Sequence, residues 1–179
     1  MNLTEKAITI SSDDYKEIDA FMKRVFPKEE LIPTWLITIL AKKKNHEFSA
    51  FYDENLFVGI SYTIESETSL FLFYLAINDK IHSKGYGSKL LNSLFDKYKD
   101  KPITLFIETL DQTAPNYEQR VKRLSFYERN NFINTNIKAG VDRPFVDILS
   151  TDKNFTVDKC KKMLKFIPLK IYTSDTLTR

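Results

Sequence analysis

The chain has 179 residues, 42% of them hydrophobic and 13% aromatic, which is enough to build the core of one domain. Its formal net charge of +3 is mild. Two histidines and a single cysteine, Cys160, argue against a zinc site and an internal disulfide. No apolar run reaches the roughly 18 residues that span a bilayer, and the N-terminus lacks a signal-peptide pattern. We therefore expect a cytoplasmic, metal-free, single-domain protein that stays off membranes and ends in a polar tail from residue 174.

The first half of the chain predicts a strand, two helices and then three strands. Residues 7–10 are a short strand candidate, and Ser11–Asp14 offers residues that cap a helix. Apolar residues recur at helical spacing at Tyr15, Ile18, Met22, Val25 and Phe26, and on one face after Pro33 at Trp35, Leu36, Ile39 and Leu40. Aromatic and β-branched residues in 48–52, 56–64 and 69–77, separated by short polar turns, predict an antiparallel meander.

The second half alternates helices and strands. The pattern predicts a helix from Gly85, a strand over 103–108, a helix through 117–127, strands over 132–137 and 145–149, and a last helix from Thr156. We find no internal repeat and no linker, so the whole of 1–179 is predicted to be one domain.

Gly85 and Gly87 stand where a helix begins, after a buried strand and the polar loop 78–84. Glycine lets the backbone approach a ligand closely, although it destabilises a helix. The first-turn amides are unpaired and lie at the positive end of the helix dipole, so they suit a pyrophosphate. The pattern therefore predicts either an anion-binding helix start or a plain tight entry into a helix.

Two other phosphate-binding motifs fit the spacing less well. A Walker loop fails because no Gly-Lys-Ser/Thr ends the run. The dinucleotide fingerprint would use Gly85, Gly87 and Glu108, which lies about twenty residues on. However, Leu90 replaces its third glycine, the loop 78–84 is too long for its tight turn, and the hairpins imply antiparallel strands.

The loop resembles the signature of the GNAT superfamily of N-acetyltransferases, Gln/Arg-x-x-Gly-x-Gly/Ala after the fourth strand. The match is His82-Ser83-Lys84-Gly85-Tyr86-Gly87, with Ile77 at the usual apolar position and Asp79 at the usual proline position. Residues 123–132, with Phe126, Tyr127 and Phe132, are similar to the superfamily's Phe-Tyr-x-x-x-Gly-Phe segment. The resemblance covers nearly the whole chain. It implies a mixed α/β (α+β) fold with a mostly antiparallel central sheet of about seven strands flanked by helices.

The match has two departures. His82 replaces Arg or Gln, which weakens a side-chain contact with the pyrophosphate but leaves the amides in place. Asn131 replaces Gly, and asparagine tolerates the left-handed conformation of a helix C-cap. Residues 107–111 and 116–120 resemble a bacterial branch of the superfamily whose substrate is unassigned.

The resemblance implies that acetyl-CoA is the cosubstrate and that its pantetheine arm lies in a gap beside the fourth strand, bound by main-chain groups. An N–H of Leu75 or Ala76 would stabilise the tetrahedral oxyanion. The implied cofactor-binding residues are Leu75, Ala76, Ile77, His82, Ser83, Lys84, Gly85, Tyr86, Gly87 and Ser88.

The resemblance also implies catalytic and acceptor residues. Tyr127 would protonate the departing thiolate, and Glu108 would act as general base or else pair with Arg120 or Arg123. The acceptor-binding residues would be Glu29, Glu30 and Trp35, since carboxylates beside an aromatic suit a cationic amine.

The sequence is compatible with three functions to different degrees. The first is an N-acetyltransferase that acts on a primary amine of a small molecule or peptide by direct attack through a tetrahedral intermediate. The alternative is a non-catalytic acyl-CoA-binding module. A nucleic-acid binder rests only on the lysines of 42–44 and 159–165, which fit solvated helix ends and faces, so we expect no nucleic acid. The sequence does not decide whether exposed sheet edges pair two copies of the chain into a homodimer.

Overall fold

The structure is a computed structural model, and it describes residues 3–81, 85–140, 145–165 and 170–173. The chain divides into two compact units. The first comprises residues 1–65 and 72–97, and the second comprises residues 66–71 and 98–179. Within the described ranges, each helix is too short or too polar to cross a membrane.

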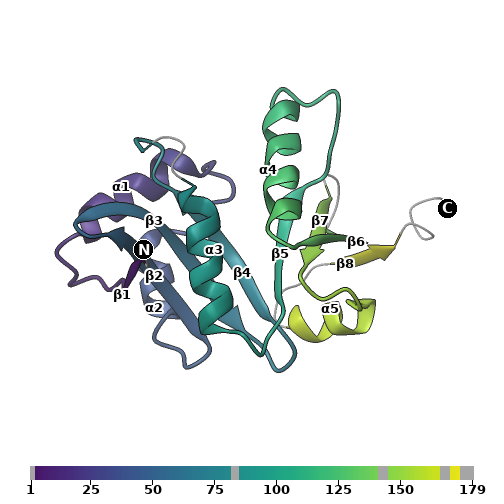
Figure 1. The fold of residues 1–179 in the computed structure, drawn as a ribbon, viewed down its shortest axis with the longest axis horizontal. Helices are drawn as coiled ribbons and strands as arrows, with labels where there is room; N and C mark the ends of the chain where they lie inside the picture. Colours follow the sequence, from purple (N-terminus) through teal and green to yellow (C-terminus); the bar gives the residue numbers. More distant parts are fainter. Residues whose placement is uncertain (1–2, 82–84, 141–144, 166–169, 174–179) are drawn as a thin grey trace. The chain divides into compact units, whose positions relative to one another are not determined.

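The first unit contains the predicted meander and three helices (Figure 1). Its elements are β1 (Thr4–Ala7), α1 (Tyr15–Val25), α2 (Thr34–Leu40), β2 (His46–Asp53), β3 (Leu56–Glu65), β4 (Leu70–Ile77), of which residues 70–71 belong to the second unit, and α3 (Tyr86–Lys97). The strand order is β1-β2-β3-β4, and β1–β2 and β2–β3 pair antiparallel.

Helices cover both faces of these strands: α3 lies in front of them in Figure 1, and α1 and α2 lie behind. Ile18, Phe21 and Met22 of α1 pack in one core with Ile37 of α2 and with Tyr74 of β4. Burial of such side chains stabilises the fold by about 1.5–3 kcal/mol each. The packing of α1 and α2 against the sheet therefore fixes the position of β4, from which the loop 78–84 leaves.

Two expectations for the first unit were wrong. The first strand is β1, residues 4–7, because Ser12 closes a turn onto Thr9 and ends the strand before the predicted span is complete. The buried face of α2 also differs from the prediction. Trp35 and Ile39 are 52% and 46% exposed, whereas Thr38 is buried because its hydroxyl donates to the Trp35 carbonyl at 2.7 Å.

The second unit contains the remaining strands and two helices. Its elements are β5 (Ile103–Glu108), α4 (Tyr117–Arg129), β6 (Ile133–Gly140), β7 (Val146–Ser150), α5 (Val157–Met163) and β8 (Lys170–Thr173). The order is β5-β7-β6-β8, and every one of these pairs is antiparallel.

Local capping in the second unit follows the sequence closely. Asn131 has φ 68°, so the asparagine adopts the left-handed conformation expected after α4. The Thr156 hydroxyl accepts the Lys159 N–H at 3.3 Å and caps α5. The sequence did not predict β8, while the predicted tail from residue 174 lies outside the described residues.

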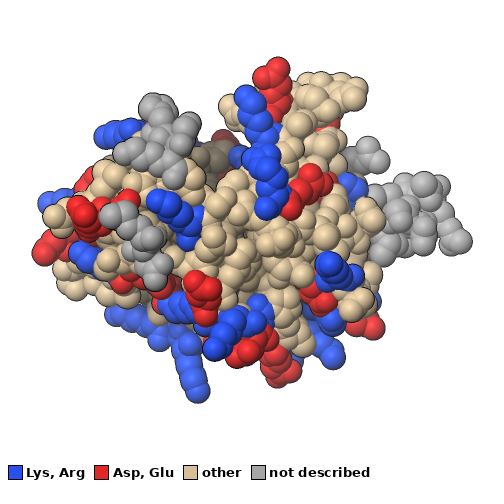
Figure 2. Space-filling model, in the orientation of Figure 1, with Lys and Arg blue, Asp and Glu red and all other residues tan. Residues whose placement is uncertain are grey.

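The predicted fold class is confirmed. Eight strands follow the order β1-β2-β3-β4-β5-β7-β6-β8, one more than expected, and helices flank the mostly antiparallel sheet. Lys and Arg side chains are interspersed with Asp and Glu on the face shown in Figure 2. Lys42, Lys43 and Lys44 are exposed, as are Lys161, Lys162 and Lys165, which is usual for lysine.

Candidate active site

The start of α3 has the geometry of an anion-binding helix end. Gly85 has φ +67°, a conformation that glycine adopts without strain, and no atom of the described residues lies within 4 Å of the position a Cβ would take. The Lys89 N–H donates to the Gly85 carbonyl at 3.1 Å, which is the first hydrogen bond of the helix between described residues. The amides of Tyr86, Gly87 and Ser88 precede that bond, so they have no acceptor within the helix. The predicted residues His82, Ser83 and Lys84 lie outside the described residues.

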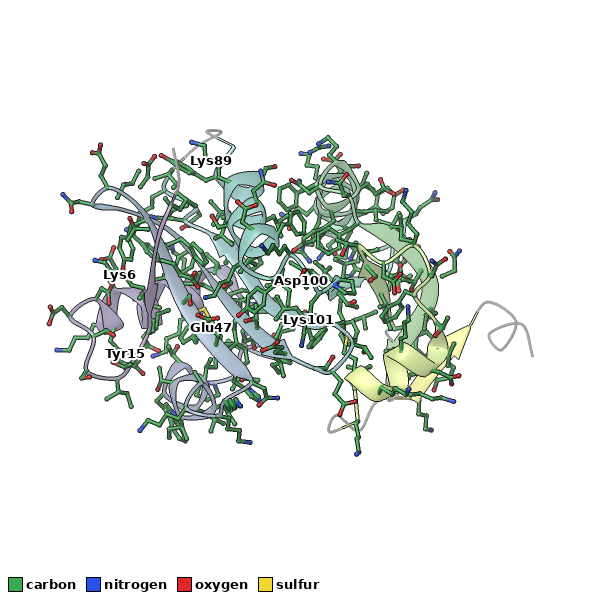
Figure 3. All side chains as sticks on the ribbon, turned by 60° about the horizontal axis from the view of Figure 1, so that its bottom comes forward. Lys6, Tyr15, Glu47, Lys89, Asp100 and Lys101 are labelled. Carbon is green, nitrogen blue, oxygen red and sulfur yellow. The ribbon has the colours of Figure 1, made fainter. Side chains whose placement is uncertain are left out.

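This helix end is also electropositive. The Lys89 ammonium lies 4.9 Å from the centroid of the Tyr86 ring, in the first turn of α3 (Figure 3). The Tyr86 hydroxyl donates to the Asp53 carboxylate at 2.7 Å, which ties the helix start to the β2–β3 turn. Residues 86–89, all of them described, include no acidic side chain, so the Asp53 carboxylate comes from outside the first turn of α3. Sequence reasoning missed Lys89, which stands only four residues after Gly85.

At the end of β4, successive main-chain groups point alternately toward β3 and away from it. The Ala76 carbonyl faces Gly59 of β3 so closely that a Cβ on Gly59 would overlap it. Two residues later, the Asn78 N–H donates to the Val58 carbonyl at 2.8 Å, on the same side. Main-chain groups of alternate residues in a strand point to opposite neighbours, so the N–H groups of Leu75 and Ile77 point away from β3. Of the two predicted oxyanion donors, this geometry favours Leu75 over Ala76.

Asn78 fixes the chain where it leaves β4. Its side-chain amide donates to the Phe57 carbonyl at 3.0 Å, and its Oδ1 accepts the Lys80 N–H at 3.2 Å. The Ile81 N–H donates to the Asn78 carbonyl at 3.1 Å, which closes a β-turn over residues 78–81. The start of the loop is therefore fixed to β3 by hydrogen bonds of Asn78. Asn78 is a buried polar residue that the sequence analysis had placed only as part of the loop.

The predicted acceptor residues lie on the loop between α1 and α2 and on the first turn of α2. Glu29, Glu30 and Trp35 are all exposed. Tyr74 holds this loop against β4, because its hydroxyl donates to the Glu30 carbonyl at 2.5 Å and accepts the Ile32 N–H at 2.9 Å. The structure therefore brings the acceptor candidates next to the strand that carries Leu75.

Tyr127 lies in the second unit, on the last turns of α4, and is 8% exposed. Its ring packs edge-on against Phe126 at 5.1 Å and Phe132 at 5.3 Å between centroids. Burial raises the pKa of its phenol to about 12, and the charge of Arg123 opposes this only in part. The phenol is therefore protonated throughout the neutral range, as a proton donor must be.

Glu108, at the end of β5, is paired. Its carboxylate accepts from the Asn116 amide at 3.0 Å and contacts Arg120 at 3.1 Å and Arg123 at 2.7 Å. Burial alone would raise the pKa of Glu108, but the Asn116 hydrogen bond and the two arginine charges outweigh it and lower the pKa. A carboxylate with a lowered pKa is a weaker base, so the geometry favours the pairing role that the sequence left open.

Comparison with known proteins identifies the family. The profile of the acetyltransferase (GNAT) family matches residues 12–132, from the loop before α1 to the residue before β6. The chain is therefore an acyltransferase by class, and it belongs to the GNAT family of acetyltransferases. No curated protein matches it.

Several solved structures share the fold. A protein described as a GNAT-family acetyltransferase from Bacteroides thetaiotaomicron has a TM-score of 0.70 and 20% identity, over 92% of this chain and 97% of that one. An aminoglycoside 6'-N-acetyltransferase complexed with coenzyme A has a TM-score of 0.62 and 14% identity, over 82% and 95%. A GNAT acetyltransferase from Elizabethkingia anophelis with acetyl-CoA bound has a TM-score of 0.58 and 15% identity, over 84% and 98%.

Proposed function

We propose that the chain is an acetyl-CoA-dependent N-acetyltransferase that transfers the acetyl group to a primary amine of a small molecule or peptide. The observation that carries this proposal is the open start of α3. There, Gly85 is left-handed and the first helical hydrogen bond begins only at Lys89. Family membership and the CoA and acetyl-CoA bound in the similar structures support this ligand.

The main chain and Lys89 have complementary roles in cosubstrate binding. The amides of Tyr86, Gly87 and Ser88 hold the pyrophosphate at the positive end of α3, and Lys89 adds a cation. The outward main-chain groups of β4 pair with the amides of the pantetheine arm as an added strand would. His82, Ser83 and Lys84 are proposed to line the same loop on the strength of the motif alone.

The acceptor amine first loses its extra proton to solvent and then attacks the thioester carbonyl directly in its neutral form. As the C–N bond forms, the carbonyl oxygen becomes an oxyanion that the Leu75 N–H stabilises. Collapse of the tetrahedral intermediate breaks the C–S bond, the ammonium proton passes to solvent, and Tyr127 protonates the CoA thiolate. Glu29, Glu30 and Trp35 are exposed, and two carboxylates with an aromatic ring would favour an acceptor that is a cation in solution.

Binding and turnover are tested separately. Calorimetry with CoA and acetyl-CoA measures the site, and thiol release over a panel of primary amines, peptides and polyamines measures the reaction. We expect binding together with thiol release on at least one amine. Binding without release on any amine would indicate the acyl-CoA-binding module instead, and a wild-type chain that binds neither CoA nor acetyl-CoA would disprove both functions.

Gly85 offers a direct check of the helix start. Gly85→Ala places a methyl group in the open space and costs about 1–2 kcal/mol of strain at positive φ. Gly85→Asn tolerates that φ but is bulkier. If the space belongs to the cosubstrate, both variants lose CoA affinity. Full recovery in the asparagine variant would mean that only backbone strain matters there.

A further inference from the structure

Asp79 is held by an arginine from α1. It occupies the second position of the β-turn over residues 78–81, directly after the anchored Asn78. The Arg24 Nε lies 3.1 and 3.0 Å from the two Asp79 carboxylate oxygens, and Nη2 lies 2.7 Å from Oδ1. The two residues are 55 positions apart in the chain, so this is a tertiary contact within the first unit.

The geometry of the pair is more favourable than that of an ordinary surface ion pair. A bidentate fork fixes both direction and distance, which a single lysine contact does not. The guanidinium carbon of Arg24 also lies 5.6 Å from the centroid of the Phe21 ring, whose side chain is buried in the α1 core. Arg24 thus has a second contact, with Phe21 of the same helix, that helps to orient its guanidinium toward Asp79.

The turn needs this constraint for a stereochemical reason. The second position of a type I or II β-turn requires φ near −60°, and proline is favoured there because its ring fixes that angle. Aspartate leaves the angle free. The Arg24 fork instead restrains the Asp79 side chain from outside the turn.

We propose that Arg24 and Asp79 are positioning residues that hold the entry of the phosphate-binding loop and thereby set its affinity for CoA. This inference rests on the proposed function, because it concerns the same site. Both side chains are partly exposed, Arg24 at 38% and Asp79 at 49%, so salt screens their attraction. The affinity for CoA consequently contains a salt-dependent contribution that comes from the protein alone.

The test compares CoA affinity across single and double variants. Asp79→Ala and Arg24→Gln are each expected to weaken CoA binding by about two- to fivefold, which is the range for an exposed pair. The double variant should be no weaker than either single one, because both remove the same interaction. Turnover at saturating acetyl-CoA should stay unchanged while KM for acetyl-CoA rises.

Asp79→Pro is the rescue variant. It fixes the turn without an ion pair, so it should restore wild-type affinity in the presence or absence of Arg24. Measured at about 50 mM and 500 mM NaCl, its affinity should fall less steeply with salt than that of the wild type. Lys23→Gln is the matched control, since it removes the 2.7 Å ion pair of Lys23 with Asp19 on the same helix and should leave CoA binding unchanged.

The possible outcomes distinguish a failure of the Arg24–Asp79 inference from a failure of the proposed function. Wild-type affinity in Asp79→Ala would overturn the inference while leaving the proposed function intact. A loss in Arg24→Gln that far exceeds the loss in Asp79→Ala would also overturn it, because Arg24 would then contact the phosphates itself. A wild-type chain without any CoA binding would overturn the proposed function and this inference together.

Discussion

A side chain on Gly59 would overlap the carbonyl oxygen of Ala76 and would lie 3.1 Å from the α-carbon of Ile77. Gly59 belongs to β3, and both neighbours belong to the end of β4 from which Leu75 and Ile77 direct their N–H groups outward. The register of β2 against β3 shifts between Phe51 and Tyr52, directly opposite this contact. The site-forming end of β4 therefore depends on a residue with no side chain in the adjacent strand.

Gly59→Ala is expected to destabilise the fold by about 1–3 kcal/mol, because the backbone of β4 has to move to admit the methyl group. The same movement should weaken CoA binding. Thermal unfolding and calorimetry measure the two effects. Ala50→Gly in β2 is the control, since Ala50 is equally buried but lies away from β4, and it should lower stability without changing affinity. Unchanged CoA affinity in Gly59→Ala would contradict the prediction.

Tyr74→Phe should loosen the loop that carries Glu30. The hydroxyl makes hydrogen bonds with two main-chain groups of that loop, and the loss of each costs about 0.5–1.5 kcal/mol. We expect KM for the amine to rise more than KM for acetyl-CoA. Tyr62→Phe is the matched control, because that hydroxyl lies 2.6 Å from the His46 ring rather than on the loop. A similar rise in amine KM for both variants would show that the loop contact is irrelevant.

Tyr127→Phe should lower turnover far more than CoA affinity. The phenol has a pKa raised to about 12 by burial, so it stays protonated at neutral pH but is a weaker acid than an exposed tyrosine, and its role depends on its position by the thiolate. The substitution keeps the ring between Phe126 and Phe132, so stability should change little. Single-turnover kinetics with calorimetry on the same preparation checks both. Equal losses of rate and affinity would argue against the acid role.

Glu108→Gln separates a structural carboxylate from a catalytic base. The lowered pKa means that the ionised form stabilises the fold at pH values above the unfolded pKa of 4.5, and that this stability is lost as the pH falls through the folded pKa. The variant should therefore lose about 1 kcal/mol at neutral pH and nothing in acid. Denaturant titrations from neutral to acidic pH measure this difference. A general base would instead show as a large loss of turnover with stability unchanged.

Much of the fold could be predicted because helix ends, strand bounds and left-handed residues depend on a few neighbouring residues in the sequence. β5 has the predicted bounds, since Asp100–Pro102 breaks the preceding helix and most of its own residues are β-branched or aromatic. Gly85 and Asn131 both adopt left-handed backbone conformations, one at the start of α3 and one after α4. Each position could be predicted from one residue and its neighbours.

Contacts between distant residues could not be predicted in this way. The buried face of α2 was wrong because Thr38 satisfies its hydroxyl within its own helix, which hydropathy does not register. β1 contains Glu5 and Lys6, whose charges meet Lys97 and the Tyr52 ring from far along the chain. The Arg24–Asp79 pair is another such contact. Charged strands and ion pairs of this kind become visible only when the tertiary structure is known.

Within the described residues, the strands at the two ends of the strand order, β1 and β8, each contain four residues. A copy of the chain that added a strand at either end would gain few main-chain hydrogen bonds, and Glu5, Lys6 and Lys170 place charges in its way. Edge-to-edge polymerisation of the native protein is therefore disfavoured. A concentrated preparation should keep a low scattering signal and bind little amyloid dye.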